Sequence, residues 1–308
     1  MRVAAVVVTF NRPQLLARCI AALHAQSVPP ELIIVFDNGS PGADPKAFGG
    51  AVAVARYSCP ANAGSGGGFY FGMREAFRLG LDAVWLMDDD GVPAPDALEA
   101  LRRASGLGIR ACNSLVVDEL NPDRLAFPLL KPDGERDAVA DIGAVTDARG
   151  IVGQHLNFFN GTFVTREAYD IIGDVKFECF IWGDEVDYQR RVARLIAESG
   201  TLLAARHAHP RQRQKFVRAG RMRQLPVSDL PRLYIMARNA AHNRSTRRPF
   251  RNLVRLTVAY GRYAARTHGL IEAIRLVAYV LDGGLNTYVL APSRRELRRR
   301  LATTRRIG

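Results

Sequence analysis

Three consecutive carboxylates, Asp88, Asp89 and Asp90, follow an apolar run from Val84 to Met87. The run is short, which favours a buried strand over a helix. Like charges at the end of a buried strand repel one another unless a cation lies among them. Oxygen-rich groups of this kind suit Mg²⁺ or Mn²⁺. A solvated, Asp-rich turn is the alternative, and both interpretations stand on these residues alone.

A second acidic group, Asp184 and Glu185, follows Trp182 and Gly183 and begins a predicted helix that runs to about Glu198. Asp184 would make a good N-cap, and acids in a first turn complement the helix dipole. Alternatively, a carboxylate held against Trp182 and Gly183 is placed for general-base chemistry. The two interpretations have similar support from this stretch alone.

Two histidines, His207 and His209, follow a short predicted strand from Leu202 to Ala205. A single histidine is usually structural, but two at the end of a strand can reach a metal ion. The chain then becomes basic, which is typical of a solvated face and also suits phosphates or anionic lipid. The basic residues are Arg211, Arg213, Lys215, Arg218, Arg221 and Arg223.

The elements that must position these side chains begin with a buried strand from Val3 to Phe10 and a helix after Pro13. Strands are also predicted at Leu32 to Phe36 and Ala51 to Tyr57. Alternation of this kind predicts an α/β fold, in which ligands bind at the carboxyl ends of the strands. The polar residues expected at that edge are Thr9, Asn11 and Asp37.

A glycine-rich stretch from Asn62 to Phe69 precedes a predicted helix that ends near Leu79. Glycines at the start of a helix allow backbone N–H groups to approach a phosphate, although flexible glycine loops are common. The spacing matches neither the P-loop nor the dinucleotide motif. In residues 110–175, scattered prolines and isolated acids predict loops between short strands, and the segment carries no motif of its own.

The charge of the chain is unevenly distributed. Residues 1–204 contain 19 Lys and Arg against 26 Asp and Glu, whereas residues 205–308 contain 24 against 4. From Leu233 on, apolar residues and arginines recur at helical spacing, which is typical of helices on a membrane surface or a partner. The basic C-terminal third therefore predicts an anionic partner.

Composition and cysteine spacing limit the class of protein. Among 308 residues, 48% are hydrophobic and 24% charged, as in a soluble globular protein. We find no apolar run of about 18 residues, so a spanning helix is not expected, and the N-terminus resembles a strand more than a signal peptide. Four scattered cysteines predict buried, reduced thiols in the cytosol, namely Cys19, Cys59, Cys112 and Cys179.

Taken in order, these motifs resemble the family 2 glycosyltransferases of the GT-A fold, over roughly residues 3–240. Each motif alone is weak, and their order makes the resemblance specific. The matching stretches are Val6-Val7-Val8-Thr9-Phe10-Asn11-Arg12, Asp37-Asn38-Gly39-Ser40, Asn62 through Phe69, Asp88-Asp89-Asp90, and Asp184-Glu185-x-Asp187.

The resemblance implies a GT-A-type α/β fold, with a mixed, mainly parallel sheet flanked by helices and a basic C-terminal helical extension. Residues 1–110 would form the sugar-nucleotide-binding half of the GT-A domain and residues 111–225 its acceptor-side half. Residues 226–308 would form the basic amphipathic helical region.

The resemblance also implies roles for individual residues. Asp88, Asp90 and His207 would hold Mn²⁺ or Mg²⁺, with His209 as the alternative to His207. Glu185 would be the catalytic base, with Asp184 as the alternative, because the family usually has Glu-Asp at this position. The remaining implied substrate-binding residues are Thr9, Asn11, Asp37, Asn62, Gly66, Gly67, Asp89 and Trp182.

Within the family, the motifs look most like those of galactofuranosyltransferases that assemble actinobacterial cell-wall galactan. The resemblance implies inverting transfer of galactofuranose from UDP-galactofuranose to a polyprenyl-diphosphate-linked glycan. The nearest competitor is a rhamnosyltransferase that uses dTDP-rhamnose. The expected location is cytoplasmic, with the protein bound peripherally to an anionic membrane surface at the inner face of the cell membrane. The sequence leaves open whether the protein forms a homo-oligomer.

Two other classes fit the sequence less well. A sugar-nucleotide nucleotidyltransferase would need a basic glycine loop after the first strand, which this chain lacks. A nucleic-acid-binding protein is suggested only by the basic third, which contains no recognisable binding module. We therefore expect no nucleic-acid partner.

Overall fold

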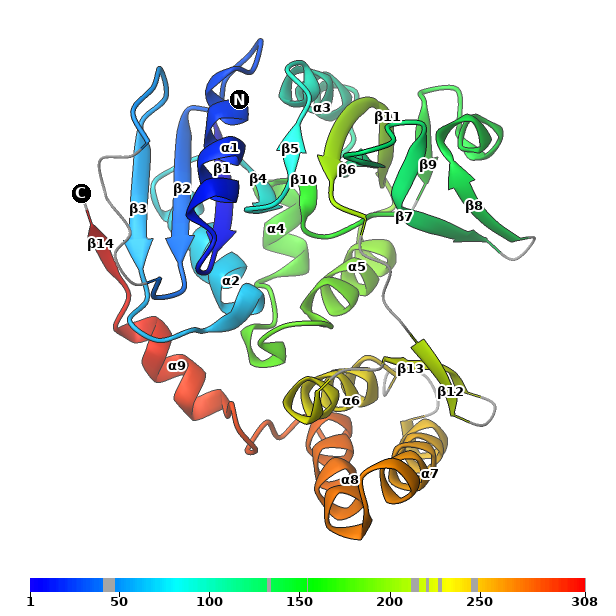
Figure 1. The fold of residues 1–308 in the computed structure, drawn as a ribbon. Helices are drawn as coiled ribbons and strands as arrows, with labels where there is room; N and C mark the ends of the chain where they lie inside the picture. The colour runs from blue at the N-terminus through cyan, green and yellow to red at the C-terminus, as the bar shows by residue number, and fades with distance from the viewer. Residues whose placement is uncertain are drawn as a thin grey trace.

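The computed structural model describes residues 1–40, 48–131, 134–153, 155–211, 216–219, 222–226, 229–244 and 249–307. In its described residues, the first third of the chain contains five strands interspersed with the helices α1, α2 and α3 (Figure 1). Four of these strands lie parallel, and β1 has β2 on one side and β4 on the other, with β3 beyond β2. The elements are β1 (Val3–Thr9), α1 (Pro13–His24), β2 (Leu32–Asp37), β3 (Val54–Ser58), α2 (Gly64–Arg78), β4 (Ala83–Asp88), β5 (Val92–Pro93) and α3 (Ala97–Gly106).

The middle of the chain extends the same sheet. Its elements are β6 (Ala111–Asp118), β7 (Arg124–Lys131), β8 (Gly134–Ala138), β9 (Ile151–Gly153), β10 (Asn160–Thr165), α4 (Arg166–Ile172), α5 (Asp184–Leu195) and β11 (Ser199–His209), with short 3-10 turns at Val139–Asp141, Gly143–Val145 and Phe177–Cys179. Strand β10 runs antiparallel between β4 and β6, and β11 pairs in parallel with β6. The main order is β14-β3-β2-β1-β4-β10-β6-β11-β5, where β14 (Arg305–Ile307) is antiparallel to β3, and three further strands branch from it: β7 pairs with β6, β8 with β7, and β9 with β11. This mixed sheet, parallel at its centre and flanked by helices, confirms the predicted fold class.

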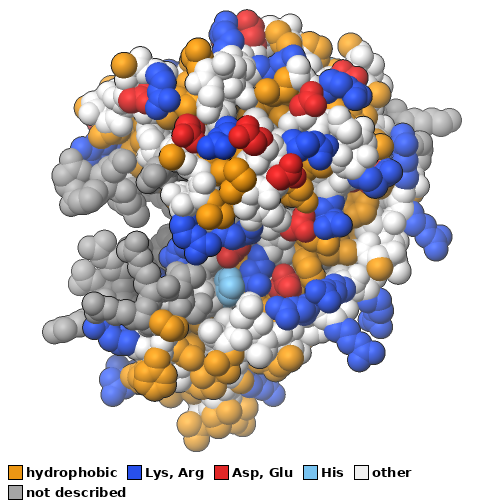
Figure 2. Space-filling model, turned by 180° about the vertical axis from the view of Figure 1, so that it is seen from behind, with side chains coloured by type: hydrophobic (Ala, Val, Ile, Leu, Met, Phe, Trp, Pro, Cys, Tyr) orange, Lys and Arg blue, Asp and Glu red, His pale blue; other side chains and the backbone are white. Residues whose placement is uncertain are grey.

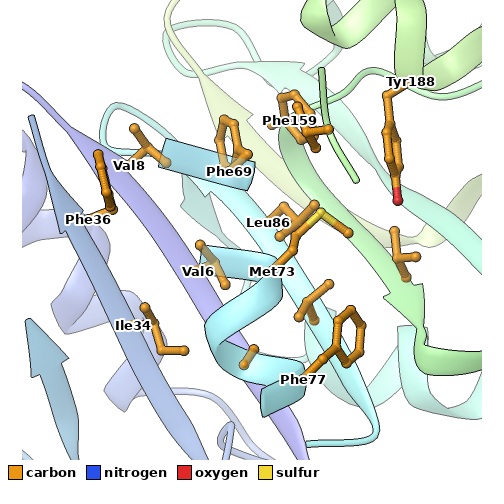
Figure 3. Packing of buried hydrophobic residues seen from close by; sticks show 14 of the residues in the cluster. Val6, Val8, Ile34, Phe36, Phe69, Met73, Phe77, Leu86, Phe159 and Tyr188 are labelled. Atoms are coloured by element: carbon orange, nitrogen blue, oxygen red, sulfur yellow. The ribbon is translucent and has the colours of Figure 1, made fainter. Parts of the chain in front are cut away.

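Helices cover both faces of β1, which explains why that strand is apolar along its whole length. On one face, Val6 and Val8 lie beneath α2 and share a buried cluster with Phe69 and Met73 of that helix (Figure 3). A Cβ atom at Gly68 would lie 2.6 Å from Val8 Cγ1, so glycine allows the helix to approach the sheet this closely. On the other face, α1 contributes Leu16, Cys19, Ile20 and Leu23.

The C-terminal third divides into two parts. Helices α6 (Leu230–Arg244), α7 (Pro249–Thr267) and α8 (Leu270–Gly284) pack together, at the bottom of Figure 1. The chain then returns to the sheet, where α9 (Arg294–Ala302) packs on α2 and β14 extends the sheet beside β3. A separate hairpin precedes α6 and consists of β12 (Phe216–Ala219) and β13 (Met222–Pro226). None of the helices in the described ranges is long and apolar enough to cross a membrane.

Several elements differ from the expectations. Helix α2 begins at Gly64, inside the stretch predicted as a glycine-rich loop, because these glycines pack on neighbouring backbone and sheet. Strand β11 extends to His209 and therefore includes both histidines. Residues 110–175 contain two eight-residue strands, β6 and β7, where the sequence predicts only short strands. All four cysteines are buried and free, as predicted.

Candidate functional site

The carboxyl ends of three parallel strands lie level with one another. Thr9 at the end of β1 pairs with Asp37 of β2, and Val8 pairs with Asp88 of β4. Asp89 and Asp90 continue directly from β4, so they lie at the edge where ligands of α/β sheets bind. The structure thus brings the predicted residues Thr9, Asp89 and Asp90 together: Thr9 Oγ1 donates a 2.7 Å hydrogen bond to Asp89 Oδ2.

Arg12, on the turn between β1 and α1, provides the positive charge at this edge. Its Nη1 atom lies 2.8 Å from Asp90 Oδ2 and 3.2 Å from Asp89 Oδ1. The guanidinium side chain is 47% exposed, whereas the side chains of Asp89 and Asp90 are 4% and 9% exposed. A half-exposed arginine thus bridges two buried carboxylates. The sequence places Arg12 in the first motif but gives no sign of this contact.

The three carboxyl groups have different pKa values. Burial, followed by the charges of Asp90 and Asp89, raises the pKa of Asp88 well above its usual value. Burial also raises the pKa of Asp89, outweighing the hydrogen bond from Thr9 and the charge of Arg12. Burial acts on Asp90 in the same direction, but the adjacent His209 and Arg12 outweigh it and lower its pKa. Asp90 is therefore the carboxylate that its surroundings keep ionised.

The two candidate histidines lie in different surroundings. His209 Nε2 is 3.2 Å from Asp90 Oδ1, and its Nδ1 is 2.8 Å from the Pro210 carbonyl oxygen. His207 is fully buried, and neither of its ring nitrogens has a hydrogen-bond partner among the described residues. Burial lowers the pKa of His207 to about 3. A Cβ at Gly91 would lie 2.0 Å from His207 Nε2, which explains why glycine follows the three acids.

Within the described ranges, no three His, Cys, Asp or Glu side chains are arranged to hold a metal ion. The closest arrangement is Asp90 with His209, a carboxylate and an imidazole that both suit Mn²⁺. Asp90 Oδ1 is buried and makes no well-aligned hydrogen bond to any described residue. Asp90 and His209 thus fit a divalent cation. Arg12 contacts Asp90 as well, together with the neighbouring Asp89.

The loop before α5 has an unusual backbone. Phe180 and Trp182 have φ angles of 64° and 56°, and Gly183 has a φ of 139°. Non-glycine residues in this region cost about 1–3 kcal/mol each, and such conformations persist where the surroundings hold them. A Cβ at Gly183 would also lie 2.6 Å from Asn239 Cβ. The conformation of this loop therefore depends on what packs against it.

Helix α6 holds this loop in place. Asn239 Nδ2 donates to the carbonyl oxygens of Cys179, Ile181 and Trp182 at 2.8, 2.9 and 3.0 Å. Asn243 Nδ2 donates to the Gly183 carbonyl oxygen at 3.0 Å. Both asparagines are buried in a helix that the sequence predicts as amphipathic. Their spacing of four residues on one helix face is the signal that could have identified them.

The two candidate bases differ in their surroundings. Asp184 is 1% exposed, and its Oδ2 accepts a 3.1 Å hydrogen bond from Ser65 Oγ. Burial, and then the charge of Glu185, raises the pKa of Asp184 well above its usual value. Glu185 is half-buried, and its Oε2 accepts a 2.7 Å hydrogen bond from the Gly183 N–H. The charge of Glu185 also contributes, less than burial and the charges of Asp90 and Asp89, to the raised pKa of Asp88.

Two of the residues predicted to bind the substrate, Asp37 and Asn11, already have partners. Asp37 Oδ2 is 2.7 Å from Arg56 Nη2 in a buried ion pair, and Asp37 Oδ1 accepts from the Ser40 N–H. Asn11 has a φ of 55°, and its N–H donates to Ser40 Oγ at 2.8 Å. The sequence predicted Asp37 and Asn11 here but gave no sign of the ion pair with Arg56.

The predicted phosphate-binding stretch is covered by other segments. Asn62 Oδ1 accepts a 2.7 Å hydrogen bond from the Gly64 N–H, and a Cβ at Gly66 would lie 3.4 Å from Asp184 Cβ. A Cβ at Gly67 would lie 3.4 Å from Leu301 Cδ2 of α9. These contacts show that Gly66 and Gly67 allow close packing. Their predicted role in substrate binding stays a prediction, as does that of Trp182, whose ring lies 5.4 Å from the Arg232 guanidinium carbon.

A pocket of about 420 Å³ is lined in part by Asp187 and Arg191 of α5. None of the predicted site residues lines it. Its lining includes Tyr70, Lys176, Asp187, Arg191, His242 and Arg298.

Comparisons with known proteins agree with the predicted family and fold. Residues 4–105 match the family described as glycosyl transferase family 2. Galactofuranosyltransferase GlfT1 of Mycolicibacterium smegmatis is 32% identical over 249 residues, which cover 78% of this chain and 82% of that protein. GlfT1 of Mycobacterium tuberculosis (strain ATCC 25618 / H37Rv) is 33% identical over 251 residues, with 77% and 80% covered.

Solved structures show the same fold at low sequence identity. S. aureus TarS 1-349 aligns with a TM-score of 0.54 and 11% identity, covering 92% of this chain and 81% of that one. The mannosyltransferase PcManGT of Pyrobaculum calidifontis, solved with GDP-Man and Mn²⁺, aligns with a TM-score of 0.50 and 14% identity, covering 98% and 85%. The predicted family and GT-A fold are confirmed. This chain belongs to family 2 of the glycosyltransferases.

Proposed function

We propose that the protein transfers galactofuranose from UDP-galactofuranose to a polyprenyl-diphosphate-linked glycan, with inversion at the anomeric carbon. The observation that carries this proposal is the identity of 32% to a protein named galactofuranosyltransferase, over 82% of that protein's length. A sugar-nucleotide donor is further supported by PcManGT, which shares the fold and was solved with GDP-Man and Mn²⁺.

In this proposal Asp88, Asp90 and His209 hold a divalent cation, Mn²⁺ or Mg²⁺, and their side chains rearrange to do so, because no three such side chains in the described ranges are already arranged as a metal site. We favour His209 over His207 because His209 lies 3.2 Å from Asp90, whereas His207 is enclosed by the fold. A bound cation would stabilise the charge of the departing diphosphate. Arg12 contacts Oδ2 of Asp90, whereas His209 faces Oδ1, so a cation at Oδ1 would be repelled by the charge of Arg12, whose half-exposed side chain can turn towards the diphosphate.

Glu185 acts as the general base in this proposal. Its carboxylate removes the proton from the acceptor hydroxyl as that oxygen attacks the anomeric carbon, a contribution of about 10²–10⁴-fold in rate. Asp184 suits this task less, since it is buried and its pKa is raised. We assign Asp184 to positioning, through its hydrogen bond with Ser65 at the start of α2.

A lipid-linked acceptor requires the protein to work at a membrane surface. We therefore propose that it associates peripherally with the inner face of the cell membrane. A homo-oligomer is compatible with this arrangement.

The test is a transfer assay with purified protein, Mn²⁺ and a polyprenyl-diphosphate-linked acceptor, in which UDP-galactofuranose and dTDP-rhamnose are compared. We expect turnover with UDP-galactofuranose and a product of inverted configuration by NMR. Glu185→Gln should abolish turnover, while Asp184→Asn, the matched amide at the adjacent position, should retain most of it. Turnover with dTDP-rhamnose alone would identify a rhamnosyltransferase and overturn the choice of donor.

A further inference from the structure

Helices α7 and α8 present apolar side chains to solvent. On α7 these residues recur every fourth position, and on α8 they form a longer stripe. Phe250 is 81% exposed, Leu270 72% and Ile274 63%. We call the whole set the α7–α8 face, and it consists of Phe250, Val254, Val258, Leu270, Ile271, Ile274, Leu281 and Leu285.

The two stripes lie on the same side of an antiparallel helical hairpin. A Cβ at Gly261 would lie 3.2 Å from Val277 Cγ2, and one at Gly284 would lie 2.4 Å from Leu253 Cδ1, which fixes how the helices pair. With about 100° of rotation per residue, each stripe then lies next to the line of contact, on the side away from α6. Figure 2 shows hydrophobic side chains gathered at this lower end of the molecule.

Arginines border the α7–α8 face. Exposed arginines follow the apolar stripe along the outer side of α7, and Arg275 lies beside the stripe on α8. The two acids of these helices are already engaged, since Glu272 pairs with Arg275 and Asp282 is buried. The arginines of α7 form no ion pair with any described residue, and they are Arg251, Arg255, Arg262 and Arg266.

We propose that the α7–α8 face docks on an anionic lipid bilayer. The apolar side chains would enter the boundary between headgroups and acyl chains, and the arginines would reach the lipid phosphates. A second copy of the chain fits this face less well, because it would place the exposed arginines of one α7 against those of another. The inference builds on the proposed function, which supplies a lipid-linked acceptor as the reason for docking.

The α7–α8 face is connected through α6 to residues 179–183, the loop that precedes Glu185. Helix α6 packs on the inner side of the hairpin, and its residues Asn239 and Asn243 hold the backbone of residues 179–183. A hairpin fixed on the membrane would therefore fix the height of Glu185 above the bilayer.

The docking surface is narrower than the basic C-terminal third that the sequence indicates. Helix α9 and β14 fold back on the sheet, where Arg294 pairs with Glu178 and Arg300 with Glu296. Arg213, Lys215 and Arg221 lie outside the described residues, as do the side chains of Arg218 and Arg223. The proposal therefore rests on α7 and α8.

The test is co-sedimentation of the full chain with phosphatidylcholine vesicles, with and without phosphatidylglycerol. We expect binding to the anionic vesicles, a fall of about tenfold or more for Leu270→Ser with Ile274→Ser, and a salt-sensitive loss for Arg255→Gln with Arg262→Gln. The matched control is Leu107→Ser with Leu120→Ser, two leucines that are 73% and 93% exposed outside this face. All these positions are on the surface, so unfolding temperatures should match that of the wild type.

Three results would overturn the proposal: no binding of the wild type to anionic vesicles, undiminished binding of both face variants, or a dimer in light scattering that the face variants convert to monomer. Transfer to a short, water-soluble acceptor separates docking from the proposed function. The face variants should retain that transfer and lose transfer to vesicle-borne acceptor. Vesicle binding through the face without any transfer would support docking and refute the proposed function.

Discussion

His209 and Asp90 face each other at the carboxyl edge of the sheet, with Nε2 and Oδ1 3.2 Å apart. Strand β11 ends at His209, and Asp90 lies on the turn after β4. His207, two residues earlier on β11, is enclosed against Gly91 and Gly161. A difference of two residues thus separates a side chain at the acidic edge from one in the interior.

Replacement of His209 tests the proposed cation site. We expect His209→Ala to weaken Mn²⁺ binding and transfer by about 10–100-fold, because a ligand of the cation is lost. His207→Ala should instead lower the unfolding temperature, since it leaves a cavity, and should leave Mn²⁺ affinity nearly unchanged. Mn²⁺ titrations followed by electron paramagnetic resonance measure the affinity directly. Weaker Mn²⁺ binding in His207→Ala alone would reverse the assignment.

Arg12 competes with the cation for the same carboxylates. In Arg12→Gln the carboxylates of Asp89 and Asp90 lose their counter-charge, so we expect Mn²⁺ to bind a few-fold to roughly tenfold more tightly in the absence of donor. The increase of the unfolding temperature on addition of Mn²⁺ should be correspondingly larger than in the wild type. Arg18→Gln, which removes an arginine paired with Glu119, is the control. Equal Mn²⁺ responses in Arg12→Gln and the wild type would contradict the competition.

Asp184→Asn should change how stability depends on pH. A carboxyl group whose pKa is raised by burial contributes its full stability below its usual pKa of 3.8, and this contribution falls as the pH rises towards the folded-state pKa. The amide does not titrate, so the variant should gain stability relative to the wild type over that interval, by about 1.4 kcal/mol per pH unit. Unfolding by urea at a series of pH values measures the difference.

Asp187→Asn, in the same helix, should change the pH dependence of stability in the opposite direction. Burial acts to raise the pKa of Asp187, but His242 and Arg191 outweigh it and lower the value. The charged carboxylate therefore stabilises the fold above its usual pKa, and that stability is lost as the pH falls through the folded-state pKa. Asp187→Asn should thus be less stable than the wild type at neutral pH and approach it in acid. The same trend in both variants would refute the two opposed shifts.

Asn239 supports the loop that carries the proposed base. Asn239→Ala leaves three backbone carbonyls without their donor, so we expect a loss of about 1–3 kcal/mol in the free energy of unfolding. We also expect a lower kcat with little change in the KM for the donor, because the loop before Glu185 relaxes. Asn243→Ala removes a single bond, to Gly183, and should have the smaller effect. A wild-type kcat in Asn239→Ala would show that α6 is not needed to position Glu185.

Elements with strong local patterns could be predicted from the amino-acid sequence alone. The continuous apolar run of β1 predicted a strand buried on both faces, and the acids after Met87 predicted a polar strand end. The order of the motifs was sufficient to identify the family and the GT-A fold. These predictions succeeded because residues close in the chain decide strand and helix periodicity, and because parallel strands collect their carboxyl ends at one edge.

The tertiary structure decided which side chains meet. Arg12 bridges carboxylates 77 and 78 residues away, and Asn239 reaches backbone up to 60 residues away. The sequence could not choose between His207 and His209 or between Asp184 and Glu185, since neighbours in the chain share one motif but differ in burial. It also predicted one basic tail, whereas packing divides that tail between the sheet and an exposed apolar hairpin. Such contacts depend on the relative placement of whole elements, which no local pattern encodes.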